Sequence, residues 1–375
     1  MALELKFDLE KALGTSISIT ALLNNSDIAS LSADILQTLS DDTADAAHAT
    51  VGFPQLTPTH ADRYQPLPIN EIQEAYWIGR SGLFDMGNVA AHVYAEFETE
   101  GLDCDRLKQS FQQLIQRHEM LRTVLLPNGQ QQVLETVPPY PMAVLDLRHG
   151  AAADQQEKLL AVRQQLSHQI HDAYQWPLFT VQVARLSDQR VRIFLSLDNL
   201  LVDGASLGLL YREWGQYYQA SEAALAPLTL TFRDYVLALK AYEQSEVYQR
   251  SLAYWQQRLA TLPPAPELPL ATQPFDLKQP QFTRVSAQLP PEVWQRLQAQ
   301  AQQAGLTPSG LLVAAYGEVL ATWSKTRHFS LNLTTFNRLP LHPQVPDIVG
   351  DFTSLTLLAI DYRNADGFWQ RARQV

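Results

Sequence analysis

The chain has 375 residues, 46% of them hydrophobic and 18% charged, which is long enough for two or three globular domains. Its formal net charge of −11 argues against a nucleic-acid-binding surface, because such a surface needs clustered Lys and Arg. No apolar run reaches the roughly 18 residues of a membrane span, and the N-terminus lacks a secretory signal. One cysteine excludes an internal disulfide and a CxxC metal site. We therefore predict a cytoplasmic protein with no metal centre.

The first 63 residues read as a short helical unit followed by a linker. Residues 1–40 carry apolar side chains at helical spacing. Residues 41–63 are rich in small, acidic and Pro residues and show no periodicity, which is typical of a linker.

From residue 64 the pattern predicts an α/β fold in two successive lobes, 64–232 and 233–375. The first lobe alternates predicted helices with strands, and its last strand, "VRIFLSLDNLL", is apolar on both faces. The second lobe begins with a strongly helical block over 231–262. It continues with predicted strands over 282–289, 328–336 and 351–362 and with helices over 291–305 and 307–324. Helix-then-strand order recurs in both lobes, so we expect two lobes of similar construction.

Two aspartates, Asp198 and Asp203, lie five positions apart in the stretch "SLDNLLVDGAS". The first ends the buried strand and the second begins the turn before a helix. A buried carboxylate is usually paired, because an unpaired buried charge is costly. Either the pair takes part in chemistry or it stabilises the turn through buried arginines such as Arg122 or Arg338.

Several segments resemble one family, in the expected order from about residue 64 to the last residue. The chain is similar to the heterocyclization domains of nonribosomal peptide synthetases, which are members of the condensation-domain superfamily. The resemblance is carried by "LPINEIQEAYWIGR", "RHEMLRTVLLPNGQQ", "LDNLLVDGAS", "YWQQRL", "GLTPSGLLVAAYGEVLATWS", "FSLNLTTFNRLPLHP" and "IVGDFTSLTLL". Where ordinary condensation domains carry a His-His pair, this chain has Asp198 and Asn199, and Asp203-Gly204 follows as in the superfamily.

The resemblance implies a fold and a reaction. The fold would be two chloramphenicol-acetyltransferase-like α/β sandwich lobes that form a V around a central tunnel. The reaction would join an acyl thioester on an upstream acyl carrier domain to Cys, Ser or Thr on a downstream peptidyl carrier domain. Cyclodehydration to a thiazoline or oxazoline would follow, as in siderophore-like secondary metabolite biosynthesis. The domain itself would need no cofactor, because the phosphopantetheine arms belong to the carriers of the larger multidomain synthase.

Loss of water from an amide requires a group that gives and takes protons. Asp351, in the apolar setting "VGDF", is where burial could raise a carboxyl pKa toward neutrality. By resemblance, Asp351 and Thr334 are the residues expected for cyclodehydration, with Thr334 oriented to hydrogen-bond the carboxyl group. Thr335 and Thr353 remain alternatives for that role.

The roles of the other site residues divide between chemistry and structure. A structural role is favoured for Asp203, and for Asp198 a base and a structural partner remain equally open. The resemblance also assigns Ser206, Asn337, Arg338 and Thr353 to substrate binding.

Residues 1–40 resemble the C-terminal half of an acyl carrier domain, without its phosphopantetheine serine. The family's second lobe also extends beyond the pattern seen here, so the C-lobe over 233–375 is expected to be incomplete. Two alternatives to a heterocyclization domain stay open: a condensation-only domain that makes a linear amide, and an inactive fragment that only docks carriers.

Overall fold

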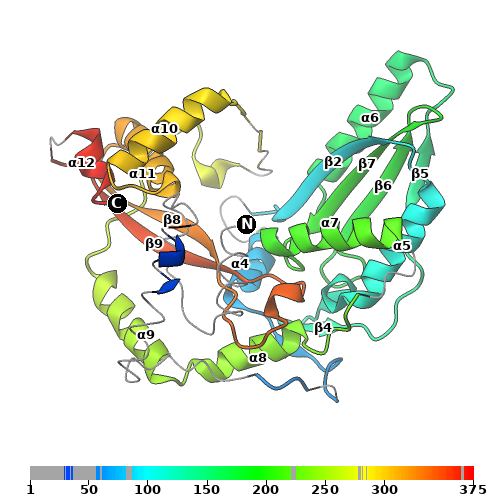
Figure 1. Cartoon of the computed structure of the whole chain (residues 1–375), viewed down its shortest axis with the longest axis horizontal. Helices are drawn as coiled ribbons and strands as arrows, with labels where there is room; N and C mark the ends of the chain where they lie inside the picture. The colour runs from blue at the N-terminus through cyan, green and yellow to red at the C-terminus, as the bar shows by residue number, and fades with distance from the viewer. Residues whose placement is uncertain are drawn as a thin grey trace.

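The computed structural model describes residues 56–59, 61–81, 87–220, 225–277, 280, 282–283, 285–364 and 367–375, together with 29, 31–33, 35 and 36. The predicted carrier half over 1–40 lies mostly outside the described residues, and so does the predicted linker over 41–63 except for 56–59 and 61–63. The described chain forms two lobes that diverge from a common base in a V (Figure 1). Both lobes are α/β, as predicted.

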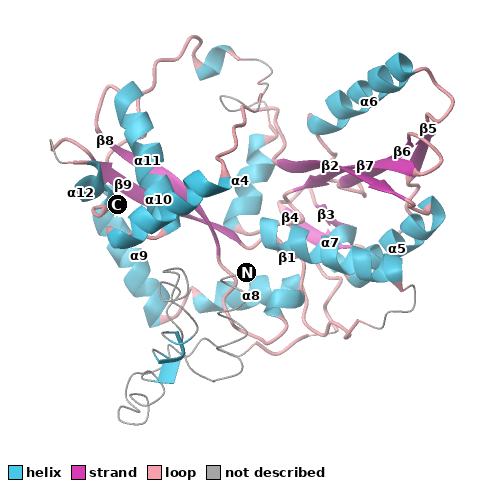
Figure 2. Ribbon diagram, turned by 45° about the horizontal axis from the view of Figure 1, so that its top comes forward, coloured by secondary structure: helices cyan, strands magenta, loops and turns pink. Residues whose placement is uncertain are grey.

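The first lobe is built on a four-stranded sheet with the order β2-β7-β6-β5. Its strands are β2 (His92–Glu100), β5 (Ala143–Asp146), β6 (Phe179–Arg185) and β7 (Arg190–Asp198). β7 is antiparallel to both neighbours, whereas β5 and β6 are parallel. Helices α5 (Cys104–Arg117) and α7 (Gly204–Gln219) lie along one face, and α6 (Ala152–Ser167) lies along the other (Figure 2).

The central strand β7 is buried on both faces because its side chains alternate between two hydrophobic clusters. Ile193 and Leu195 join the main core, whereas Phe194 joins the smaller cluster beneath α6. The register pairs His92 of β2 with Asp198, so the strand carries Asp198 to the end of the sheet.

A small sheet and one helix lie between this lobe and the rest of the chain. Strands β1 (Leu67–Pro68), β4 (Gln130–Val133) and β3 (Thr123–Leu125) form an antiparallel sheet in the order β1-β4-β3, and η1 (Glu119–Arg122) precedes β3. Helix α4 (Glu71–Gly79) begins with Asn70 and Gln73 in a capping box, in which each side chain accepts a backbone N–H of the other.

The second lobe contains a two-stranded antiparallel sheet and several helices. Its elements are α8 (Phe232–Tyr242), α9 (Glu246–Leu259), η2 (Pro274–Asp276), α10 (Pro291–Gln303), α11 (Pro308–Trp323), β8 (His328–Phe336), η3 (Val345–Asp347), β9 (Thr353–Asp361) and α12 (Phe368–Ala372). The strand predicted over 282–289 is wrong, because its described residues form no ladder and Val285 is 96% exposed. An alternating pattern becomes a strand only where a neighbour accepts its hydrogen bonds, and β8 and β9 pair with each other instead.

The main core crosses the predicted lobe boundary at 232/233. Phe232 and Tyr235 of α8, together with Ile348 and Phe352 from the loop before β9, are buried in the same cluster as the first lobe. The loop that leads into β9 is therefore fixed to the first lobe.

Among the described residues, no single helix has the length and apolarity of a membrane-spanning segment. Only α10 and α11 taken together, as a pair bent by 98°, combine them.

Candidate functional site

The site is centred on the loop between β7 and α7, where both aspartates of "DNLLVDG" are buried. Asp198 has no exposed surface and Asp203 is 4% exposed. Asp203 is the N-cap of α7, and its carboxylate accepts from the Ser206 N–H at 2.6 Å. An aspartate at this position satisfies a backbone donor that the first turn of a helix leaves free.

Asp203 also joins the first lobe to the segment that leads into β9. Its carboxylate accepts from Arg338 Nη2 at 3.2 Å and from the Phe352 N–H at 3.3 Å. Its own N–H donates to the Gly350 carbonyl at 3.0 Å. Both oxygens of Asp203 therefore have hydrogen-bond donors, which fits the predicted structural role and confirms Arg338 as its partner.

Arg338 and Ser206 complete this anchor. Arg338 donates to the carbonyls of Val345 and Ile348, each at 2.9 Å, and to Ser206 Oγ at 2.8 Å. Ser206 Oγ in turn donates to the Gly350 carbonyl at 2.7 Å. Ser206 has no exposed surface, so its hydroxyl stabilises the loop from within. Burial lowers the pKa of Arg338, but a guanidinium remains charged in a protein.

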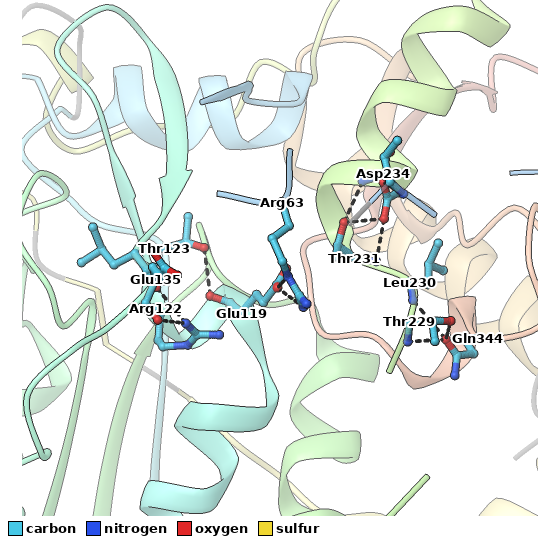
Figure 3. Close-up of polar contacts among 12 residues, drawn as sticks. Arg63, Glu119, Arg122, Thr123, Glu135, Thr229, Leu230, Thr231, Asp234 and Gln344 are labelled. Atoms are coloured by element: carbon cyan, nitrogen blue, oxygen red, sulfur yellow. Dashed lines mark hydrogen bonds and ion pairs between the residues drawn. The ribbon is translucent and has the colours of Figure 1, made fainter. Parts of the chain in front are cut away.

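Two further contacts fix the loop that precedes Asp351. Gln344 Oε1 accepts from Thr229 and Leu230 just before α8, at distances between 2.8 and 3.1 Å (Figure 3). Gly350 lies against Phe232, where an added Cβ would come within 2.2 Å of the ring. Only glycine fits this close approach without a shift of the core.

Asp351 differs from Asp203 in how its carboxyl group is satisfied. It is 1% exposed, and Oδ1 accepts from the Thr353 N–H at 3.0 Å. Oδ2 is buried and has no hydrogen-bond partner among the described residues. The pKa of Asp351 is raised to about 7: burial is the largest cause and nearby Asp203 adds to the rise, while hydrogen bonds from Thr353 oppose it. A carboxyl group with this pKa gives and takes protons near neutral pH.

The threonine that contacts Asp351 is Thr353, one of the two alternatives to the preferred Thr334. Thr334 on β8 is exposed and lies opposite Leu355, four residues beyond Asp351, which is roughly 13 Å of strand. The expected hydrogen bond from Thr334 is absent from the contacts of the described Asp351 carboxyl group. The error arose because the register of β8 and β9 was unknown from sequence.

Asp198 has a different partner from the one predicted. It forms an ion pair with Arg80 at the end of α4, and it accepts from the Leu200 N–H at 3.0 Å. His171 Nδ1 lies 3.9 Å from Asp198, and burial lowers the pKa of this histidine to about 4, so it is neutral near pH 7.

Arg122, the other predicted partner, donates to the backbone carbonyls of Leu134 and Glu135 at 2.8 Å each (Figure 3). The sequence does indicate a partner for Arg80, because a charged residue that ends an apolar helix usually has one, but it does not indicate that the partner is Asp198.

The remaining predicted site residues lie on the strand ends near Asp351. Asn337 is exposed at its side chain, and its backbone N–H donates to the Phe352 carbonyl at 2.9 Å. Asn70, at the start of α4, was not predicted from the sequence. Its side chain donates a hydrogen bond of 2.8 Å to the Asp351 carbonyl.

Within the described part of the chain, no cluster of His, Cys, Asp and Glu has the arrangement of a metal site.

Residues 63–375 match the family model described as the condensation domain. The chain belongs to the condensation-domain family. It is 39% identical over 313 residues to pyochelin synthetase PchF of Pseudomonas aeruginosa. The aligned region covers 83% of this chain and 17% of PchF. It is also 34% identical over 331 residues to phenyloxazoline synthase MbtB of a Mycobacterium species. Here the aligned region covers 88% of this chain and 28% of MbtB. The chain therefore spans well under a third of these curated relatives.

Solved structures of this family share the fold. The structure of the EpoB cyclization-docking bidomain from Sorangium cellulosum, a nonribosomal peptide synthetase, has a TM-score of 0.82 and 38% sequence identity, over 91% of this chain and 68% of that one. The two-lobed α/β fold predicted from the resemblance is thus the fold of the condensation-domain family.

Proposed function

We propose that this condensation domain joins a carrier-bound acyl thioester to carrier-bound Cys, Ser or Thr and then closes a thiazoline or oxazoline ring. The observation that carries the proposal is Asp351, a buried carboxyl group with one free oxygen and a pKa raised to about 7. The names of two similar proteins support ring formation: MbtB is a phenyloxazoline synthase, and the EpoB structure is that of a cyclization domain.

The reaction has two parts that balance separately. In the first, the acceptor α-amine attacks the donor thioester, the amide C–N bond forms, and the thiol of the donor phosphopantetheine arm leaves. In the second, the acceptor side-chain thiol or hydroxyl attacks the new amide carbonyl. The carbonyl oxygen then leaves as water with one proton from that nucleophile and one from the amide nitrogen, and a C=N bond forms.

Asp351 is the group we propose for the proton transfers of the second part. As a carboxylate it accepts a proton from the ring-forming heteroatom or the amide nitrogen, and as an acid it protonates the departing hydroxyl group. Thr353 binds one of its oxygens, and the other is buried without a hydrogen-bond partner among the described residues.

The other predicted site residues divide into supports and substrate contacts. We assign Asp203, Arg338 and Ser206 to the anchor that positions Asp351, because their polar groups are buried and bound to one another. Thr334 and Asn337, which are exposed on β8 and just after it, are the proposed substrate contacts.

The test measures the mass of the downstream carrier after reaction of the intact protein with an acyl-loaded donor carrier and a cysteinyl-loaded acceptor carrier. The wild-type protein should give the acyl-cysteinyl adduct minus one water. Asp351→Asn should accumulate the linear adduct, with cyclodehydration slowed about 10²- to 10⁴-fold. Asp361→Asn is the matched control, because Asp361 is an exposed carboxylate at the far end of β9.

Each outcome identifies a different function. A wild-type adduct that retains its water would mean a condensation-only domain. No adduct with any of several donors and acceptors would mean a fragment that only docks carriers.

A further inference from the structure

The two-stranded sheet of β8 and β9 has one buried face and one exposed face. Residues that pair directly across an antiparallel ladder lie on the same face, and successive residues of a strand alternate between faces. Phe329 and Leu331 of β8 and Ile360 of β9 share the first face, where they are buried in a cluster with Ala321 of α11. The second face therefore points away from α11.

The exposed face carries three large apolar side chains. They are Phe336 and Leu355, each 48% exposed, and Leu357, which is 42% exposed. When an antiparallel sheet packs only one face on a core, its other face is usually polar, and large apolar side chains gathered on an exposed face indicate a binding surface. We call these three side chains the apolar face.

The apolar face begins beside the carboxyl group that we propose for ring closure. Phe336 pairs in the ladder with Thr353, whose backbone N–H binds Asp351 Oδ1 at 3.0 Å. Leu357 lies four residues farther along β9 than Thr353, which is roughly 13 Å of strand. The apolar face is thus an elongated surface with Asp351 near one end.

Phe336 also reaches the first lobe. A Cβ added to Gly204 would come within 3.1 Å of Cζ of the Phe336 ring, so glycine permits this close approach. Gly204 is the first residue of α7 and directly follows its N-cap, Asp203. The ring therefore lies against the start of α7 while about half of it stays exposed. This contact places the apolar face at the site rather than on a remote surface of the second lobe.

We infer that the apolar face binds the donor acyl group, that this group is a hydrocarbon chain or an aromatic ring, and that Phe336 is the residue that selects it. The inference rests on the proposed function, because the reacting amide carbon must then lie at Asp351. The donor acyl group is the substituent on that carbon and remains attached to it throughout the reaction. It therefore extends from Asp351 onto the neighbouring surface.

The other parts of the substrates fit this surface poorly. The acceptor side chain of Cys, Ser or Thr is small and becomes part of the ring. The phosphopantetheine arms carry amide and hydroxyl groups, which lose hydrogen bonds to water when they are buried against apolar side chains. A hydrocarbon or aromatic group, by contrast, is stabilised when it leaves water for such a surface.

The experiment measures how the acyl group affects the KM of the donor carrier. Donor carriers loaded with acetyl, benzoyl or dodecanoyl groups react with a cysteinyl-loaded acceptor carrier and the intact protein, and intact mass gives the initial rate as the sum of linear and cyclized adducts. The wild-type KM should be about 10-fold lower for the benzoyl and dodecanoyl donors than for the acetyl donor. Phe336→Ala should raise the KM of the two larger donors about 10-fold, with kcat and the acetyl KM within about twofold of wild type.

A second variant and a control separate acyl binding from packing. Leu357→Ala tests the far end of the apolar face, away from α7, and should raise the KM of the dodecanoyl donor about 3- to 10-fold while the shorter benzoyl donor is unaffected. Tyr316→Ala is the matched control, because Tyr316 is an exposed aromatic residue of α11, the helix on the opposite face of the sheet. It should match wild type with all three donors.

The outcomes distinguish this inference from the proposed function. Unchanged KM values for the larger donors in both Phe336→Ala and Leu357→Ala would overturn the inference and leave the proposed function intact. An equal rise for all three donors, acetyl included, would mean that Phe336 only packs against α7. A wild-type protein with the expected donor preference whose adducts never lose water would support the apolar face and overturn the proposed ring closure.

Discussion

Asp203 and Asp351 are two buried carboxyl groups within the same local network, and they are satisfied to very different extents. Asp203 accepts hydrogen bonds from two backbone N–H groups and from Arg338. Asp351 is equally buried, but one of its oxygens has no partner among the described residues. A fully paired carboxylate is stable as an anion and suits a structural role, whereas a desolvated and half-paired one exchanges protons near neutral pH.

The largest effect is expected from removing the partner of the paired carboxylate. Arg338→Ala leaves Asp203 buried without its cation and frees the Val345 and Ile348 carbonyls. The free energy of unfolding should fall by about 3–5 kcal/mol in urea denaturation, as for other broken buried pairs. Arg190→Ala, which removes a half-exposed partner of Glu98, should change little. Equal losses in the two variants would show that Asp203 needs no partner.

A smaller effect with a defined pH dependence is expected at the half-paired carboxylate. The folded-state pKa of Asp351, about 7, lies above its ordinary value of 3.8, so the folded protein binds the proton more tightly than the unfolded chain does. The contribution of Asp351 to stability should therefore be greatest below about pH 4 and be lost as the pH rises through 7, by about 4 kcal/mol at most. Asp351→Asn mimics the protonated group and should remove this loss, which makes it more stable than wild type at pH 8.

Urea denaturation of both proteins at several values between pH 5 and pH 8 checks this expectation. Asp361→Asn is the control: the pKa of Asp361 is lowered to about 2 by Arg363, so its contribution to stability changes only below about pH 4. Parallel stability curves for wild type and Asp351→Asn would mean that Asp351 stays ionised in the folded protein.

The order of elements was largely predictable from sequence because most of it rests on local patterns. The doubly buried strand that ends at Asp198 and the helix that follows Asp203 were both predicted correctly. The strand over 282–289 was not, because strand formation depends on a partner that the local pattern does not reveal. The helical block over 231–262 is interrupted at residues 243–245, where Ser245 caps a second helix.

The site was predictable in its residue types and only partly in its contacts. The apolar surroundings of Asp351 indicated a raised pKa, and the buried position of Asp203 indicated an arginine partner. The pairing of Asp198 with Arg80 joins residues 118 positions apart, and no local pattern encodes it. Whether Thr334 reaches Asp351 depended on the register of β8 and β9, which becomes visible only in the fold.

The smallest effect is expected from replacing the two threonines considered as partners of Asp351, Thr353 and Thr334. The Thr353 side chain and its backbone N–H both lower the pKa of Asp351, and Thr353→Val removes only the side-chain hydroxyl, so it should raise the pKa further, by on the order of one pH unit. Thr334→Val should leave the pKa of Asp351 unchanged, even if it slows the reaction, because Thr334 lies opposite Leu355 and makes no such bond. The pH dependence of the cyclization rate measures the midpoint separately from the maximum rate. A midpoint that moves with Thr334 and not with Thr353 would mean that Thr334 reaches Asp351 in the working enzyme through a movement of β8 past β9.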